Sequence, residues 1–187
     1  MGKINVGLIG TGWCGGIRAN TCAGSPIVDE IHIAEIDEGR LSEIVEQTNA
    51  TSGTTDYKEV LARDNIDTII VSATPETTHY PMAKESLEAG KHVLLEKPLA
   101  LTLSEADELV ALAKGKSLKF AIAYSQRFNP KFAYVRKSLQ EKKIGDPVSV
   151  LVSRHLTRGL GTKISGRIKL SPAAMEATHD IDFVLWC

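Results

Sequence analysis

Three glycines near the amino terminus, Gly10, Gly12 and Gly15, have the spacing G-x-G-x-x-G. An apolar run that ends at Ile9 precedes them, and a segment with helical character follows them. A glycine-rich turn between a strand and a helix suits a pyrophosphate, because the backbone can approach closely and the helix N-terminus offers free N–H groups. The residues of this turn that we expect to contact a dinucleotide are Gly10, Thr11, Gly12, Trp13, Cys14 and Gly15. The alternative is a tight turn that binds no ligand.

An acidic residue at a suitable distance strengthens the dinucleotide interpretation. Asp37 follows a second apolar run, residues 31–36, and lies about twenty residues after Gly15. A carboxylate there accepts hydrogen bonds from the adenosine ribose hydroxyls and repels the 2′-phosphate of NADP, so NAD is favoured. Asp37 also fits the N-cap of the next helix. Arg40 would contact a 2′-phosphate if Asp37 turned away.

The composition describes an ordinary globular chain without a charge bias. The 187 residues are 43% hydrophobic and 24% charged, with a formal net charge of −1. Nothing in this balance predicts binding to nucleic acid or to an anionic membrane. Cys14, Cys22 and Cys187 show no metal-ligand spacing, so we expect no metal and a reducing, cytoplasmic location. We also expect no signal peptide and no membrane span, because no apolar run is long enough.

Apolar runs and amphipathic segments alternate along the first two thirds of the chain. Such alternation predicts an α/β fold with a doubly wound parallel sheet of the Rossmann type, covered by helices on both faces. The expected strands are residues 4–9, 31–36, 54–56, 67–72, 92–95 and 118–123. The expected helices include residues 38–47, 57–62, 78–89 and 104–113. Together these elements predict a dinucleotide-binding domain over residues 1–123.

The pattern changes after residue 123. We expect a loop over residues 124–130, a helix over 130–142, a strand over 148–152 and a long loop over 154–169. A last helix is expected over residues 171–187, with Ser171 as its N-cap. One strand and two helices do not close a domain. Residues 124–187 are therefore expected to form the start of a second, incomplete α+β domain.

Several segments, taken together, resemble the Gfo/Idh/MocA family of oxidoreductases. They are GLIGTGWCGG at 7–16, TDY at 55–57, ATP at 73–75, AGKHVLLEKPLA at 89–100, RFNP at 127–130, IGDP at 144–147 and HDID at 179–182. The segment that contains EKP is the most specific of them. Members of this family continue into a large open sheet that forms the substrate and oligomerisation domain. The chain resembles the amino-terminal half of such a protein, and a full-length form is expected to be a homo-oligomer.

The resemblance implies a dehydrogenase that uses a nicotinamide cofactor. In this chemistry a CH–OH group of a sugar, inositol or related polyol or hydroxy acid gives hydride to NAD, and a base removes the hydroxyl proton. The resemblance implies Lys97 as the base and His179 as its partner. A lysine serves as a base only when its pKa is lowered toward the working pH, whereas histidine already titrates in that range. Beyond the glycine turn and Asp37, the implied cofactor-binding residues are Ala73, Thr74, Pro75, His79, Glu96 and Lys97.

The substrate side of the site shows one departure from the family pattern. Many family dehydrogenases carry an aspartate four residues before the histidine, where this chain has Met175. Glu176 is the nearest acid and would lie near the face of His179 in a helix, so we expect it to contact substrate instead. Arg127 is also expected to contact substrate, although it would equally serve to bridge the two domains.

A stretch of basic character runs from Pro147 to Met175 and contains no Asp or Glu. Its basic residues are Arg154, His155, Arg158, Lys163, Arg167 and Lys169. One interpretation is a solvated basic loop. The other is that Arg154 and His155 bind an anionic substrate, a carboxylate or a phosphate, beside the nicotinamide.

Plainer roles and other functions fit some of the same residues. Lys97 would be a surface residue paired with Glu96, and His179 a hydrogen-bonded residue between the two domains. Met175 favours a non-catalytic nucleotide-sensing or regulatory protein, whereas Lys97 and His179 favour an enzyme. A third possibility is a hydrolase that uses bound NAD as a transient redox agent, which the wider family also contains.

Overall fold

The computed structural model describes residues 2–153, 155 and 176–187. The chain divides into two compact units, Met1–Ala123 and Tyr124–Cys187, and each is described by itself. Within the described residues, no helix combines the length and the apolar character needed to span a bilayer.

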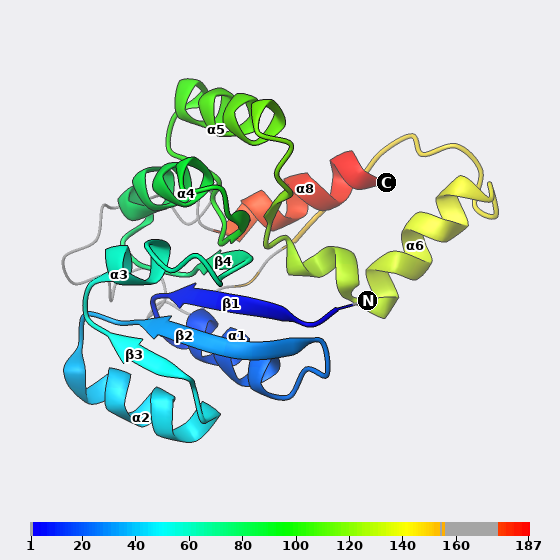
Figure 1. The fold of residues 1–187 in the computed structure, drawn as a ribbon. Helices are drawn as coiled ribbons and strands as arrows, with labels where there is room; N and C mark the ends of the chain where they lie inside the picture. Colours follow the sequence, from blue (N-terminus) through cyan, green and yellow to red (C-terminus); the bar gives the residue numbers. More distant parts are fainter. Residues whose placement is uncertain (1, 154, 156–175) are drawn as a thin grey trace. The chain divides into compact units, whose positions relative to one another are not determined.

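The first unit is built on one parallel sheet with the strand order β3-β2-β1-β4-β5-β6 (Figure 1). Its strands are β1 (Ile4–Ile9), β2 (Val28–Ala34), β3 (Ser52–Thr54), β4 (Thr68–Val71), β5 (His92–Leu95) and β6 (Phe120–Ile122). The chain builds outward from β1 to β3 and then returns to place β4 on the other side of β1. This reversal makes a topological switch point between β1 and β4, where ligands bind in doubly wound sheets. The expected fold class is confirmed.

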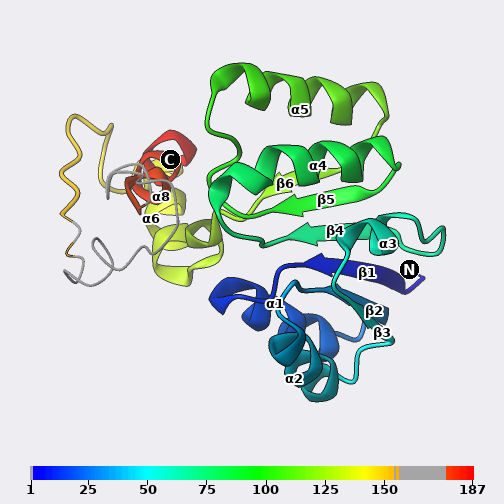
Figure 2. The same cartoon turned by 90° about the vertical axis from the view of Figure 1, so that its left-hand side faces the viewer.

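Helices cover both faces of the sheet, as Figure 2 shows. They are α1 (Trp13–Ala23), α2 (Glu38–Thr48), α3 (Tyr57–Leu61), α4 (His79–Glu88) and α5 (Leu103–Gly115). One core packs Leu87 of α4 and Leu109 of α5 against the sheet, and the other packs Ala19 of α1 and Ile44 of α2 against its opposite face. Each fully buried leucine contributes about 2 kcal/mol through the removal of apolar surface from water.

Short polar side chains start several of these helices, as their sequences predict. Thr102 begins α5 with a reciprocal capping box, in which its hydroxyl accepts from the Glu105 N–H and the Glu105 carboxylate accepts from the Thr102 N–H. Asp56 caps α3 in the same way through the Lys58 N–H. These local bonds fix where the connecting loops end, and therefore where each strand must stop.

Two strand boundaries differ from the expected ones. The second strand begins at Val28 because Val28 pairs with Ile4, and it ends at Ala34. Ile36, expected inside the strand, is therefore 85% exposed. The third strand, Ser52–Thr54, precedes the expected 54–56 because its register partners are the last residues of β2.

The second unit contains α6 (Pro130–Gln140) and α8 (Thr178–Trp186), preceded by a short 3-10 helix at Ser125–Phe128. Phe132 of α6 packs edge-on against Phe183 of α8, with ring centroids 4.7 Å apart. The strand expected over 148–152 is wrong: these residues form no regular structure, and Val148 is 98% exposed. No strand among the described residues pairs with this segment, so its β-propensity has no ladder to join. Positions 171–175 and most of 154–169 lie outside the described residues.

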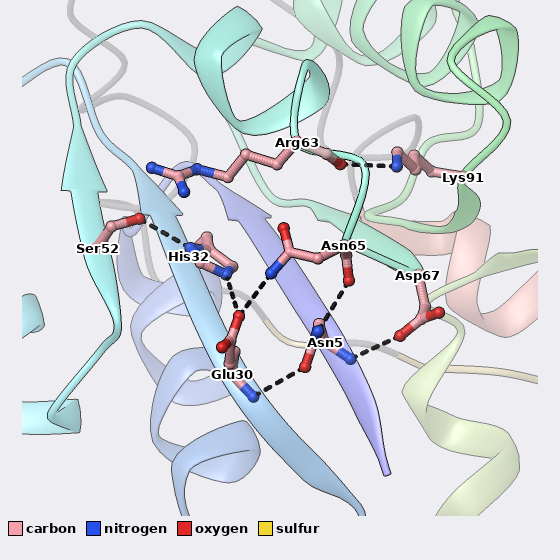
Figure 3. Close-up of polar contacts among 8 residues, drawn as sticks. All are labelled: Asn5, Glu30, His32, Ser52, Arg63, Asn65, Asp67 and Lys91. Atoms are coloured by element: carbon pink, nitrogen blue, oxygen red, sulfur yellow. Dashed lines mark hydrogen bonds and ion pairs between the residues drawn. The ribbon is translucent and has the colours of Figure 1, made fainter. Parts of the chain in front are cut away.

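A polar network ties the amino ends of the strands together (Figure 3). His32 of β2 is buried, with Nδ1 2.8 Å from the Ser52 hydroxyl and Nε2 3.1 Å from a Glu30 carboxylate oxygen. The Asn65 side-chain amide donates to the same Glu30 oxygen at 2.6 Å. The network lies at the edge of the sheet opposite the glycine turn, so it serves the fold rather than the candidate site.

Asn5 joins three segments of this network. Its side-chain amide donates to the carbonyl oxygen of Asn65 at 2.8 Å, and its side-chain oxygen accepts from the Glu30 N–H at 3.2 Å. Its own backbone N–H donates to the Asp67 carboxylate at 2.8 Å. One short side chain therefore links β1, β2 and the segment that leads into β4.

We predict that Asn5→Ala lowers the free energy of unfolding by about 1–3 kcal/mol, because two backbone groups lose their partner. Urea unfolding followed by circular dichroism measures the change. Asn20→Ala is the matched control, since the Asn20 amide donates only to the Gly16 carbonyl within an exposed helix turn. Its cost is expected to stay within about 0.5 kcal/mol. Equal costs for the two variants would contradict the linking role of Asn5.

Candidate cofactor-binding site

The glycine turn connects β1 to α1 at the switch point of the sheet. Gly10 has a φ of 84°, and a Cβ there would lie 2.6 Å from the Cα of Ala73. A Cβ at Gly15 would lie 2.0 Å from the carbonyl oxygen of Gly10. Both positions therefore require glycine, because the turn, α1 and the loop after β4 pack backbone against backbone.

Gly12 differs from its two neighbours in the motif. A Cβ at Gly12 would meet only Arg40 Nη1, at 3.9 Å, so the protein itself leaves this space open. Gly12 is also the N-cap of α1 and has no side chain to cap it. The first N–H groups of α1 lack helical acceptors and point toward this open space. This arrangement fits a pyrophosphate, which needs close backbone approach and N–H donors.

The turn is anchored by a buried carboxylate that the sequence did not single out. Glu35, directly after β2, accepts hydrogen bonds from both the N–H and the hydroxyl of Thr11, each at 2.7 Å, through Oε2. Its other oxygen accepts from the Asp37 N–H at 3.2 Å. Burial opposes ionisation of this group, but the hydrogen bonds from Thr11 and Asp37 outweigh it and lower the pKa of Glu35.

Asp37 takes the position of N-cap of α2. Its carboxylate accepts from the Arg40 N–H at 2.9 Å, and the residue is exposed. The capping alternative is therefore observed, while contact with a ribose stays a prediction. The sequence motif pointed to Asp37 alone because the strand was expected to run to residue 36; a strand that ends at Ala34 makes Glu35 the first acid at its carboxyl end.

A groove of about 730 Å³ runs from the glycine turn between α1 and α2. Thr11, Gly12 and Trp13 form its upper end, and Arg40 faces them from α2. Trp13 is 85% exposed, which agrees with a role for its backbone rather than its side chain. Cys14, the next residue of the turn, is half-buried.

The loops after β4 and β5 are joined by a buried histidine. His79 has Nδ1 2.7 Å from the carbonyl oxygen of Pro98 and Nε2 3.1 Å from that of Ala73. Thr78 closes the same turn through a bond from its hydroxyl to the Pro75 carbonyl. The His79 ring thus holds the two loops together, so its predicted part in cofactor binding would be exerted through them.

A buried hydroxyl lies at the switch point beside the glycine turn. Ser72 directly follows β4, and a Cβ at Gly15 would come 3.3 Å from its own Cβ. Its Oγ is buried and has no hydrogen-bond partner in the described part of the chain. An orphaned buried hydroxyl is uncommon in native proteins and is consistent with a site that receives a polar ligand. The sequence analysis did not identify it.

Glu96 and Lys97 directly follow β5, in the same unit as the glycine turn. The Glu96 carboxylate is buried and pairs with the guanidinium of Arg18 on α1. Glu96 Oε2 also accepts from the backbone N–H of Lys97 at 3.2 Å. Lys97 itself is half-buried. The simple alternative of a surface lysine paired with Glu96 does not describe this pair, because the Glu96 carboxylate is held by Arg18.

The second unit holds the other predicted site residues. Arg127 donates from Nε and Nη2 to the two carboxylate oxygens of buried Asp182, at 2.9 and 2.6 Å. These bonds raise the pKa of Arg127 and join the short 3-10 helix to α8. Arg127 is thus part of an internal ion pair within this unit, a role that sequence reasoning did not consider.

The remaining predicted residues are placed as follows. His179 lies on α8 with its ring edge-on to Tyr124, at 6.2 Å between centroids. Glu176 is half-buried just before α8, and His155 is exposed with Nε2 3.2 Å from the Ser153 hydroxyl. Arg154 lies outside the described residues. Lys97 and His179 belong to different units, so their pairing stays a prediction. In the described part of the chain, no three His, Cys, Asp or Glu side chains group to hold a metal.

Known proteins share both the sequence and this fold. Residues 4–124 match the model of the oxidoreductase family with an NAD-binding Rossmann fold, Gfo/Idh/MocA. Inositol 2-dehydrogenase 2 of Paenarthrobacter aurescens is 33% identical over 194 residues, covering 98% of this chain and 55% of that protein. Inositol 2-dehydrogenase 1 of Saccharopolyspora erythraea is 30% identical, covering 98% of this chain and 54% of that protein. The chain therefore spans about half the length of these curated relatives.

Solved structures agree with the sequence relatives. GenD2 from gentamicin A biosynthesis, crystallised in complex with NAD, matches with a TM-score of 0.71 and 30% identity over 76% of this chain and 40% of that one. The scyllo-inositol dehydrogenase of Lactobacillus casei matches with a TM-score of 0.83 over 99% of this chain and 55% of that one; at 22% identity it shows the fold alone. With the glycine turn at the switch point, these matches establish that the chain belongs to the Gfo/Idh/MocA oxidoreductase family, whose NAD-binding Rossmann domain it contains in residues 4–124.

Proposed function

We propose that this chain binds NAD and acts in the dehydrogenation of a CH–OH group on a polyol of the inositol or sugar class. The observation that carries the proposal is the open backbone space at Gly12, between the required glycines Gly10 and Gly15. The names of the sequence relatives, inositol 2-dehydrogenases, support the substrate class. When bound, NAD⁺ supplies the hydride acceptor.

The pyrophosphate would lie over Gly12, held by the first N–H groups of α1. The Glu35–Thr11 bonds keep the turn in this shape before any ligand arrives, so little ordering cost remains at binding. Ser72 Oγ offers a further buried donor at the same edge. Each of these groups belongs to the first unit, which makes cofactor binding testable apart from catalysis.

Two acids bear on the choice between NAD and NADP. Glu35 is fully engaged by Thr11 and Asp37, whereas Asp37 is exposed next to the groove. We therefore assign the ribose contact, and repulsion of a 2′-phosphate, to Asp37, with Glu35 as the anchor of the turn. Arg40 faces Gly12 and would favour a phosphate in the absence of Asp37.

In the chemical step, Lys97 would remove the hydroxyl proton and His179 would orient the hydroxyl. The position of Lys97 directly after β5, with its backbone held by Glu96, supports this role, since the carboxyl ends of parallel strands face the ligand. The resemblance to the family supports His179. An anionic substrate bound by Arg154 and His155 is a further part of the proposal, supported by the acid-free stretch from 147 to 175.

Two broader features complete the proposal. A homo-oligomeric full-length form is proposed from the resemblance to the family. A reducing, cytoplasmic location is supported by Cys22 and Cys187, which are free thiols.

Gly12→Ala is expected to weaken NADH binding at least tenfold, because the added methyl fills the space where a pyrophosphate would lie. Fluorescence titration of NADH with the 187-residue chain measures the dissociation constant. Gly115→Ala is the matched control, since a Cβ at Gly115, the last residue of α5, meets nothing within 4 Å. Unchanged binding in Gly12→Ala would remove the observation on which the proposal rests.

Asp37→Ala is expected to lower the preference for NAD over NADP about tenfold, since a repulsive carboxylate is replaced and Arg40 stays. The ratio of the two dissociation constants is the measurement. The variant also loses an N-cap, which costs about 1 kcal/mol of stability. Asp56→Ala loses the equivalent cap of α3 and serves as the control for that cost. A preference that shifts equally in both variants would argue against Asp37 as the discriminating residue.

Lys97→Met is expected to lower kcat by about 10²–10⁴-fold, the usual contribution of a general base, while NADH affinity changes less than threefold. The assay follows NADH formation from NAD⁺ and myo-inositol at 340 nm. Lys91→Met is the control, because the Lys91 ammonium donates to the Arg63 carbonyl at the opposite edge of the sheet (Figure 3). Full activity in Lys97→Met would exclude Lys97 as the base.

A further inference from the structure

Arg18 is the cation that faces the Glu96 carboxylate. It lies on α1, and its Nε donates to Glu96 Oε1 at 2.8 Å, with Nη2 donating to the same oxygen. The two side chains are largely buried, at 24% and 11% exposure. The pair spans the sheet from α1 to the end of β5, a sequence separation that leaves no local reason for it.

The two oxygens of Glu96 have different partners. Oε1 is held by Arg18, and Oε2 accepts from the backbone N–H of Lys97 at 3.2 Å. The carboxylate therefore connects a helix to the backbone of the next residue along the chain. Because α1 also begins at the glycine turn, the same helix presents N–H groups at its first turn and a guanidinium near its middle.

The placement follows from strand alternation. Leu94 packs into the core beneath α1 and α2, whereas Val93 and Leu95 pack into the opposite core. Glu96 continues the alternation of Leu94 and so comes out on the α1 face. A carboxylate buried there needs a charged partner, since an isolated buried charge is strongly unfavourable. Arg18 supplies it.

We propose that Arg18 is a positioning residue for Lys97, acting through Glu96, which it holds in place and whose charge it neutralises. This inference deepens the proposed function and rests on it for the role of Lys97. Without Arg18, the Glu96 carboxylate is released beside the Lys97 ammonium and a nearby positive charge is lost. Both changes favour the protonated amine, which is the form that cannot act as a base.

Arg18→Met tests the proposal, because methionine keeps the apolar stem and removes the charge. Two quantities are measured on the 187-residue chain. The first is the rate of acetylation of Lys97 by acetic anhydride at pH 8, read by peptide mass spectrometry. The second is kcat for NADH formation from NAD⁺ and myo-inositol. We expect the labelling rate to fall about five- to tenfold and kcat to fall at least tenfold, with NADH affinity within threefold of wild type.

Two further variants separate positioning from general damage. Arg18→Lys restores a positive charge with a single donor group and is expected to recover part of the labelling rate and of kcat. It also gives a folded variant if Arg18→Met does not fold. Lys84→Met removes the cation of the Lys84–Glu108 ion pair between α4 and α5, and should change neither quantity.

The outcomes distinguish this inference from the proposed function. An unchanged Lys97 labelling rate in Arg18→Met, or an equal fall in Lys84→Met, overturns the positioning role. If the wild-type chain forms no NADH from myo-inositol, the dehydrogenase proposal fails for that substrate, and the labelling rates alone decide whether Arg18 controls the state of Lys97.

Discussion

The first turn of α1 lies against the end of β1 so closely that no side chain fits between them. A Cβ at position 15 would lie 2.0 Å from the Gly10 carbonyl oxygen, well inside any real contact. This close approach sets the start of α1 and the course of the loop after β4. It also leaves the N–H groups of the helix facing open space at Gly12. The candidate cofactor site is a consequence of this packing rather than an addition to it.

Buried charges then connect the parts of the site. Glu35 fixes the glycine turn through Thr11, and Glu96 fixes the backbone of Lys97 while Arg18 holds its charge. His79 joins the loops after β4 and β5. None of these groups needs to touch a ligand to matter, because each sets the position of a group that would. The edge of the sheet that faces the ligand is therefore stabilised by polar contacts, while the opposite edge relies on the Asn5 and His32 network.

The second unit uses similar chemistry for a structural end. Arg127 resembles a residue placed for an anionic ligand, yet its guanidinium forms a fork with the two oxygens of Asp182. A planar, five-donor side chain is suited to both tasks. The sequence cannot separate them, because the partner lies more than fifty residues away along the chain and only the folded unit brings it near.

The sequence by itself determined the parallel fold, the glycine turn and the order of the elements. Strand alternation and G-x-G-x-x-G spacing are local patterns, so they can be read without contacts. Tertiary structure decided the rest. It ended β2 at Ala34, which made Glu35 rather than Asp37 the anchor of the turn. It left the expected strand at 148–152 without a partner, and it paired Arg18 with Glu96. Strand ends and buried ion pairs depend on neighbours distant in sequence, and no local pattern records them.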